Sequence, residues 1–364
     1  MDQWAARAAD SSALDYPDLK RQLAISLERI GDVLIVLDRT EDALRAHDAI
    51  LKLFESDQSR TDLSNDFAAV NQKLGRMYNT LGDPKSALRY FVRALEVSTQ
   101  LARENATRTD LQLEALKSRI AFAEALVRDG QTMAALQQLR ETVHIYVRTA
   151  QAGIEWDRLG YDAFLALGRL LAATDSDRGL AQLREARSIA RRIAITTGKD
   201  SRFDLKLAFV ATQEADALIE LGDPAGALAV SEAVVGDIRS LVARKAASEA
   251  ALAQGLGNLA WYAIIANQSA RALQATDEAI ELAGDTHWIQ ISRGHALLAL
   301  GSRREAMEQY KRIAPNQRRD GKKWSDEIIH HLVRLKGSGV AIEALSDGER
   351  LDIARVELEA SHGK

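Results

Sequence analysis

Apolar and polar residues recur in the same order in two well separated segments. The string LGDPKSALRY occupies 81–90, and LGDPAGALAV occupies 221–230. Each string predicts a helix that ends at Leu-Gly, where the glycine takes a left-handed turn, followed by a new helix that aspartate caps and proline begins. Pro84 and Pro224 are separated by 224 − 84 = 140 residues. This distance equals about three units of roughly 47 residues, which indicates a tandem array.

Small residues mark the units between and around these segments. A small residue recurs in the first helix of each unit: Gly31, Gly75, Ala123, Gly168, Ala215, Ala260 and Gly294. About twelve residues later an alanine lies on the second helix: Ala43, Ala87, Ala135, Ala181, Ala227, Ala272 and Ala306. The first-helix positions are spaced by 44, 48, 45, 47, 45 and 34 residues. Small side chains let two helices approach closely, so the pattern predicts seven helix pairs.

The starts of the first helices carry a second signal. Asp18-Leu19, Asp62-Leu63 and Asp110-Leu111 each place leucine twelve residues before the small position; Trp156 has the same spacing, and Asp204-Leu205 stands slightly closer. We expect each aspartate to cap its helix and to suit the positive helix end. The early units are therefore predicted as pairs of long helices, whereas the last has a 34-residue period.

The second and seventh units resemble the tetratricopeptide repeat. The residues that carry the resemblance are Leu74, Gly75, Tyr78, Gly82, Ala87, Phe91 and Ala94 in one unit, and Gly294, Leu297, Gly301, Ala306 and Tyr310 in the other. The resemblance covers roughly 18–315 and implies an all-α, right-handed superhelical solenoid of about seven helix-turn-helix repeats. It is weakest in the fourth unit, where ATDSDRGLAQL replaces the usual glycine turn and Ala181 aligns only after a one-residue slip.

Three regions are expected along the chain. Residues 1–17 are predicted to form an N-terminal helix or the remnant of a preceding repeat, 18–315 the repeat array, and 316–364 capping helices. In the last region an amphipathic helix with Trp324, Ile328, Leu332 and Leu335 on its buried side is followed by a short helix around 347–360. Such a cap would cover the apolar face of the last repeat. The long-helix spacing resembles arrays attached to bacterial signalling proteins, which implies a portion or relative of a larger effector.

Composition narrows the functional classes. The formal net charge of −4 argues against a nucleic-acid binder that relies on bulk electrostatics. The absence of cysteine excludes a disulfide scaffold, a cysteine zinc site and a cysteine nucleophile. The first residues lack a signal-peptide pattern, and no stretch approaches the roughly 18 apolar residues of a membrane span. These features favour a cytoplasmic protein without membrane insertion.

No catalytic motif is complete. The string TTGKDS at 196–201 has Ile193 in place of the earlier phosphate-loop glycine and Asp200 in place of the magnesium-binding hydroxyl. His330 and His331 are adjacent, so on a helix they point about 100° apart and cannot hold one metal ion from the same face. The sequence therefore predicts a non-enzymatic protein without cofactor or metal. The segment 303–323 has eight basic residues against three acids. We interpret it as a solvated outer face; the alternatives are a contact for an acidic partner, a phospholipid surface or nucleic acid.

The resemblance also implies where a partner binds. Tetratricopeptide grooves usually bind through the second, fifth, ninth and twelfth positions of the first helix. In this sequence those positions include Gln72, Arg76, Asn79, Asp162, Arg169, Gln254, Trp261, Trp288 and His295. The two tryptophans are either aromatic anchors or core residues. The lysine–asparagine pair with which some family members clamp a terminal carboxylate is replaced by Glu28 and Asp32 in the first repeat.

The leading functional prediction is a scaffold or adaptor that holds a protein or peptide partner in this groove. The alternative is a sensor or regulatory arm of a larger signalling effector; an enzyme in its own right is the least supported. Self-association through the end repeats is a further expectation, since an uncapped solenoid end exposes apolar surface.

Overall fold

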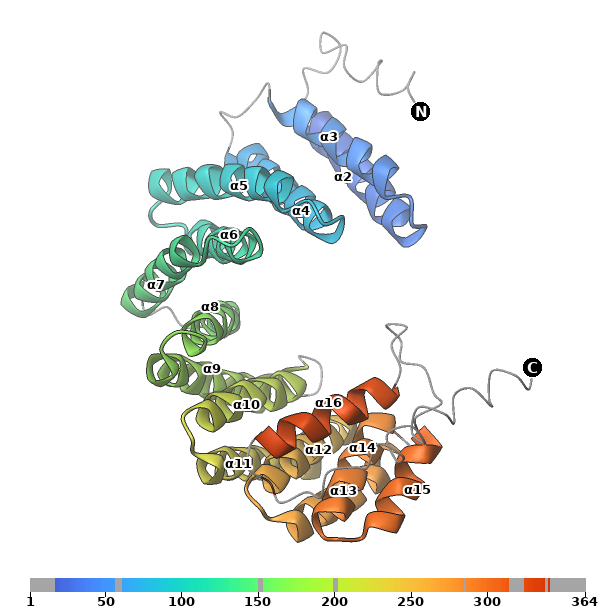
Figure 1. Ribbon diagram of the computed structural model, residues 1–364. Coiled ribbons are helices and arrows are strands. Elements are labelled where there is room, and N and C mark those ends of the chain that lie inside the picture. Colours follow the sequence, from blue (N-terminus) through green and yellow to red (C-terminus); the bar gives the residue numbers. More distant parts are fainter. Residues whose placement is uncertain are drawn as a thin grey trace, which may run out of the picture. The chain divides into compact units, whose positions relative to one another are not determined.

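The fold is all-α. The computed structural model describes residues 17–55, 61–149, 153–198, 202–284, 286–313, 324–337 and 340. Within these residues there are fifteen helices and no strand, so the predicted all-α class is confirmed. Figure 1 shows the helices as successive antiparallel pairs. The predicted first segment, 1–17, and the short helix near 347–360 lie almost entirely outside the described residues.

In the described part of the chain, seven helix pairs and one further helix follow in order. The first helices of the pairs are α2 (Pro17–Val36), α4 (Thr61–Thr80), α6 (Thr109–Arg128), α8 (Ile154–Ala172), α10 (Phe203–Glu220), α12 (Glu249–Ile265) and α14 (His287–Ala299). The second helices are α3 (Thr40–Glu55), α5 (Pro84–Glu104), α7 (Thr132–Thr149), α9 (Ser176–Thr197), α11 (Pro224–Ala243), α13 (Ser269–Ala283) and α15 (Arg303–Ile313). The last helix is α16 (Trp324–Gly337). The early pairs are long, as predicted: α5 has 21 residues and α15 has 11.

The two matching segments form the turns that their sequences predict. The Asp83 carboxylate accepts a hydrogen bond from the Ser86 N–H at 3.0 Å, and α5 begins at Pro84. Asp223 caps α11 in the same way, through the Gly226 N–H at 2.8 Å. The preceding glycine of the first turn, Gly82, has φ +76°, which an L side chain would strain. These turns set the angle at which each second helix folds back on its first helix.

The capping role expected for two aspartates is wrong. Arg108 stands at the N-cap position of α6 without a side-chain capping hydrogen bond, and Asp110 is the second residue of the helix. There Asp110 pairs with Arg108, and this contact lowers the pKa of Asp110 to about 2. Asp204 likewise lies in the first turn of α10 and is buried. Its carboxylate accepts hydrogen bonds from the N–H and hydroxyl of Ser248, at 3.0 and 3.1 Å, and so links two successive repeats. Both aspartates still lie at the positive end of a helix.

In the first, second and seventh repeats the glycine of the first helix faces a large side chain sixteen residues later. A Cβ at Gly75 would lie 2.7 Å from the Phe91 ring, and one at Gly294 would lie 2.4 Å from the Tyr310 ring. In the first repeat a Cβ at Gly31 would overlap the buried His47 imidazole. Helix pairs in these repeats therefore approach as closely as the small-residue pattern predicts.

The small residue predicted on the second helix of the fourth repeat is wrong. Ala181 is exposed, whereas Gly179 is buried. The Gly179 N–H donates to the carbonyl of the capping residue Asp175, as the Ala87 N–H does to Asp83 four residues before it. The small residue of the second helix is therefore the fourth residue after the capping aspartate, and in the fourth repeat this residue is Gly179 where other repeats have alanine.

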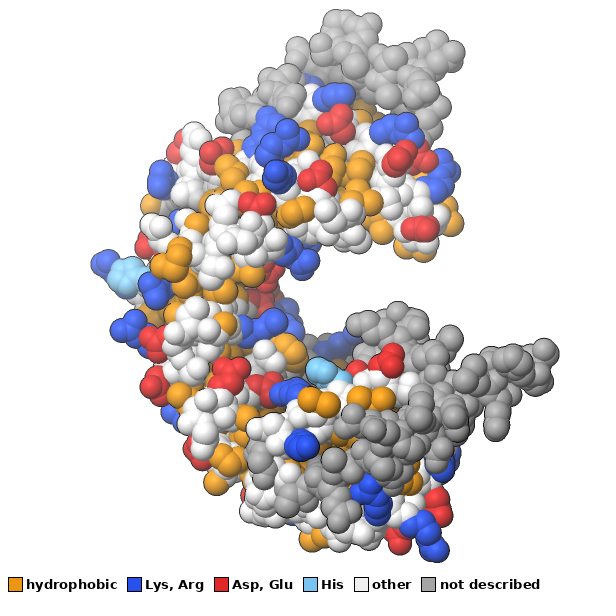
Figure 2. Space-filling model, in the orientation of Figure 1, with side chains coloured by type: hydrophobic (Ala, Val, Ile, Leu, Met, Phe, Trp, Pro, Cys, Tyr) orange, Lys and Arg blue, Asp and Glu red, His pale blue; other side chains and the backbone are white. Residues whose placement is uncertain are grey.

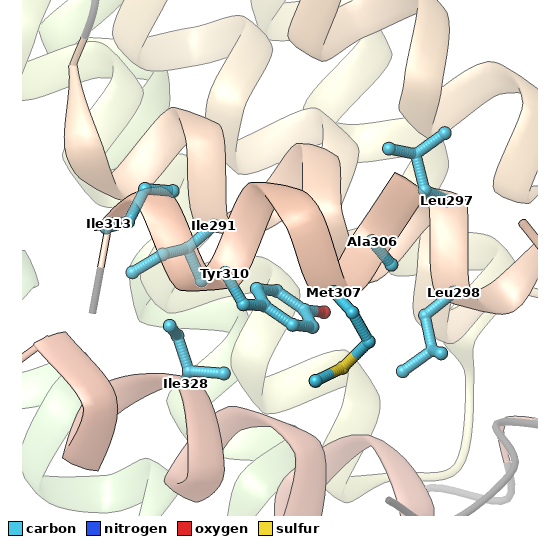
Figure 3. Packing of buried hydrophobic residues seen from close by; sticks show 8 residues of the cluster. All are labelled: Ile291, Leu297, Leu298, Ala306, Met307, Tyr310, Ile313 and Ile328. Atoms are coloured by element: carbon cyan, nitrogen blue, oxygen red, sulfur yellow. The ribbon is translucent and has the colours of Figure 1, made fainter. Parts of the chain in front are cut away.

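The chain divides into two compact units, 1–170 and 171–364. In unit 1 (1–170) a cluster that includes Phe54, Phe67 and Leu74 joins α2, α3 and α4. In unit 2 (171–364) a cluster joins α14, α15 and α16. Figure 3 shows that Ile328 of α16 points towards Ile291 and Tyr310 in this cluster.

Candidate protein-binding surface

One residue in each first helix follows the small residue directly, and we call these the column residues. In unit 1 they include Arg76 of α4, Glu124 of α6 and Arg169 of α8, all exposed. In unit 2 they are Asp216 of α10, Trp261 of α12 and His295 of α14. The column residues lie in equivalent places on successive first helices, which repeat the same geometry.

The unit 1 column carries charges of alternating sign. The Glu124 carboxyl is surrounded by enough protein, and by the nearby Asp162 carboxylate, to raise its pKa above the ordinary value. Arg128, Arg169 and Arg76 oppose this rise. The predicted residues Arg76, Asp162 and Arg169 therefore belong to one electrostatic group with Glu124 and Arg128, drawn from three successive first helices. Figure 2 shows basic and acidic side chains mixed over both units, so neither unit presents a large surface of one charge. A partner that recognises this protein by charge would therefore contact a local group of charged side chains such as this one.

The other two residues predicted in the second repeat, Gln72 and Asn79, both have buried side-chain atoms. The buried Gln72 amide donates a hydrogen bond to the Ser118 hydroxyl of α6 at 2.8 Å. The Asn79 Oδ1 is buried and accepts no hydrogen bond within the described part of the chain. In the first repeat Glu28 and Asp32 both contact the Lys73 ammonium of α4, so these acids join adjacent repeats.

In unit 2, helix α16 covers the column residues. The Arg334 guanidinium lies 5.3 Å from the centre of the Trp261 ring and 3.9 Å from the Asp216 carboxylate. The His331 ring lies 5.0 Å from Trp261, and its Nδ1 is 3.4 Å from Nε2 of His295. Figure 1 shows α16 beside α12 and α14. The predicted residues Trp261 and His295 thus contact a helix of the same chain.

A line of polar groups runs through this contact. His295 is fully buried, and its Nδ1 lies 2.6 Å from the Tyr310 hydroxyl. On its other side it faces His331, whose Nε2 contacts Glu327 at 3.2 Å. Burial lowers the pKa of His295 well below its usual value, and burial also lowers the pKa of His331. Both imidazoles are therefore neutral at neutral pH, and each can donate one hydrogen bond and accept another.

The remaining predicted residues lie between repeats of unit 2. Trp288 is half-buried and packs against Gly257, where a Cβ would lie 2.2 Å from the indole ring. Gln254 is also half-buried and donates a hydrogen bond to Asn258 at 3.1 Å. Asn258 in turn donates to the Thr212 hydroxyl of α10 at 2.8 Å. Contact of these residues with a partner stays a prediction.

Sequence reasoning missed Glu124 and Asp216. Both directly follow a small residue that the pattern had already identified, Ala123 and Ala215. The register that led to Arg76, Trp261 and His295 would therefore have found them. Asp216 lies deep enough for burial to raise its pKa, against the opposing effects of the Tyr262 hydroxyl at 3.0 Å and of Arg334.

Among the described residues, no group of three or more histidine, aspartate or glutamate side chains is placed to hold a metal ion. No helix in the described ranges is long and apolar enough to cross a membrane. Seven helix pairs in tandem, with their equivalent residues aligned on successive first helices, define a helical-repeat protein.

Comparison with known proteins identifies the repeat. Residues 68–100, which contain most of α4 and α5, match the tetratricopeptide repeat model, so the resemblance predicted for this helix pair is confirmed. A search of curated proteins gives no match.

Solved structures show similar arrangements at low identity. RapI without ligand is 11% identical and has a TM-score of 0.47; 93% of this chain and 99% of that one are covered. A Rap protein complexed with Competence and Sporulation Factor is 12% identical with a TM-score of 0.43, over 94% and 98% of the two chains. The C-terminal part of a repeat protein from Cytophaga hutchinsonii is 14% identical with a TM-score of 0.46, over 84% and 98%. At these values the similarity does not bear on what this chain binds.

Proposed function

We propose that this chain is a protein-interaction scaffold that binds a peptide or helix of a partner protein along the column residues of unit 1. The observation that carries the proposal is the charge group formed by Arg76, Glu124, Arg128, Asp162 and Arg169. These exposed side chains come from three successive first helices, so one extended ligand can contact all of them.

The chemistry of this group suits a polypeptide of mixed charge. Arginine guanidinium groups donate several hydrogen bonds in a fixed plane, which fits carboxylates and backbone carbonyls. The Glu124 and Asp162 carboxylates accept hydrogen bonds from backbone N–H groups or from a basic side chain. Three residues after Arg76 on the same helix, the buried Asn79 Oδ1 accepts no hydrogen bond within the described part of the chain.

A photo-crosslinking amino acid placed beside the charge group tests this proposal without removing a charge. Val127 of α6 is 41% exposed and lies three residues after Glu124, one turn along the same helix. Val147 of the second helix α7 is 58% exposed and serves as the matched control. In a native lysate we expect a discrete protein crosslinked from position 127 and not from position 147. Equal crosslinking from both positions, or crosslinking from 147 alone, would move the contact surface away from the first helices.

Self-association through the first repeat is a second proposal, carried by exposed apolar residues on α2 and just after it. Ile30, Val33, Val36 and Leu37 are 44%, 58%, 85% and 60% exposed. A cluster of exposed apolar side chains favours burial against another surface. Light scattering over a range of protein concentrations tests it.

A further inference from the structure

Helix α16 lies across three successive repeats instead of covering only the end of the array. Its Arg334 reaches Asp216 of α10 at 3.9 Å and lies over Trp261 of α12. Its Trp324 stacks on His287 of α14, with ring centres 5.7 Å apart and planes at 8°. A cap for the last repeat needs contacts with α14 and α15 alone. The extra contacts follow the column residues of unit 2.

Helix α16 buries a smaller share of its residues than a helix inside the repeats does. Three of its 14 residues are buried: Ser325, Ile328 and Leu335. In the first helix of the last repeat, α14, nine of 13 residues are buried. Leu332 and Trp324 also pack against the apolar cluster, and His331 and Arg334 contact Trp261. Tryptophan and arginine are enriched where two proteins meet. The surface under α16 therefore has the character of an interface.

The residues of α16 define what this surface accepts. Ile328 and Leu335 are seven residues apart, so they lie on the same side of the helix two turns apart. His331 lies between them and contacts Trp261 and His295. Arg334 supplies a positive charge that the Asp216 carboxylate and the face of the Trp261 ring both attract.

We propose that the column residues of unit 2 form a helix-binding surface on which α16 is an internal ligand, and that the partner it accepts is an amphipathic helix with the same pattern. That helix carries two aliphatic residues seven apart, an imidazole or aromatic ring between them, and arginine or lysine beside the second. The proposal rests on the proposed role in protein binding, but it uses other residues, so each can fail without the other.

The tether explains why α16 occupies the surface in the free chain. Ten residues, 314–323, join α15 to α16. A short tether gives an attached ligand an effective concentration in the range of about 1 mM. A partner helix therefore competes with α16, and weakening α16 in the full chain should open the surface to a helix added from outside.

The test uses the full chain and a fluorescent peptide with the sequence of α16, WSDEIIHHLVRLKG. In the variant Leu335→Asp, an acid replaces a fully buried side chain of α16, while α10, α12 and α14 keep their sequences. Fluorescence anisotropy should show the peptide binding this variant at least about tenfold more tightly than it binds the wild-type chain, because the tethered competitor is weakened. The peptide that itself carries Leu335→Asp should bind neither chain. The matched control is Val333→Asp in the full chain, at a position that is 61% exposed, and should behave as wild type.

Three results would overturn the proposal. The first is a Leu335→Asp chain with wild-type helicity that does not bind the peptide. The second is wild-type hydrogen exchange in which α16 opens only together with α12 and α14, because a releasable helix must open alone and faster. This measurement decides the question even where Leu335→Asp fails to fold. The third is a wild-type dimer that Leu335→Asp abolishes, which would assign the surface to α16 of a second copy.

Discussion

Gly75 offers a quantitative test of the close approach between paired helices. Alanine is favoured over glycine in a helix interior by about 0.8–1 kcal/mol, so Gly75→Ala would stabilise a helix that packs against nothing. In the structure, however, the new Cβ would lie 2.7, 2.8 and 2.9 Å from three carbons of the Phe91 ring. Ordinary contact begins at 3.4 Å, so the ring would have to move by 3.4 − 2.7 = 0.7 Å at its closest carbon.

Phe91 has little room for this movement, since it is 2% exposed and packed in the core. Overpacking of a well-packed core costs about 1–3 kcal/mol. After the gain in helix propensity, we expect Gly75→Ala to lower the free energy of unfolding by up to about 2 kcal/mol. The control is Gly236→Ala in α11, where an added Cβ meets no atom within 4 Å and should raise the free energy of unfolding by about 1 kcal/mol.

Urea unfolding followed by circular dichroism measures both changes, and hydrogen exchange of the α4 and α5 amides localises the first. The variants should shift the unfolding midpoint in opposite directions. If Gly75→Ala stabilised the chain as much as Gly236→Ala does, the steric reason given for the small residue would be refuted.

Three further perturbations have defined outcomes. Asp223→Ala removes the carboxylate that accepts a hydrogen bond from the Gly226 N–H, and it should lower the urea midpoint by an amount equivalent to about 1 kcal/mol. An unchanged midpoint would show that this capping hydrogen bond does not stabilise the turn. Val33→Glu places a charge on the exposed side of α2 and should reduce the sedimentation coefficient at high concentration if the first repeat self-associates; identical values for both chains would contradict that proposal. The lowered pKa values of His295 and His331 mean that docked α16 holds both rings neutral. Docking should therefore be independent of pH above the ordinary imidazole value of about 6.5 and weaken as the pH falls below it, because the released rings take up protons; an NMR titration that gives His295 an ordinary pKa would contradict this.

The repeat architecture was predictable because small residues and turn residues recur at fixed offsets. The fourth repeat lacks the glycine turn, and there the spacing predicts the wrong residue. Where the glycine turn is missing, the spacing of small residues predicts Ala181, whereas counting from the capping Asp175 leads to Gly179. The helical periodicity within each repeat fixes which residues face the partner helix, but only where the turn is recognised.

The site was predictable in its positions and not in its contacts. The register of the small residues placed Arg76 and Arg169 on the same face, and the same register contains Glu124. The periodicity of the last helix identified its buried side correctly, since Ile328 and Leu335 are fully buried. Periodicity does not say which surface covers that side, so the contact of α16 with Trp261 could not be foreseen.

Charge reversal on the unit 1 column tests the central claim most directly. The variant Arg76→Glu with Arg169→Glu reverses two charges around Glu124, and the control Arg140→Glu with Arg148→Glu makes the same change in net charge on the exposed side of α7. We expect affinity capture from a native lysate, quantified by mass spectrometry, to retain the same partner with the wild-type chain and the control, and to lose it with the column variant while helicity is unchanged. Capture of the same partner in equal amounts by all three chains would contradict binding along the column residues.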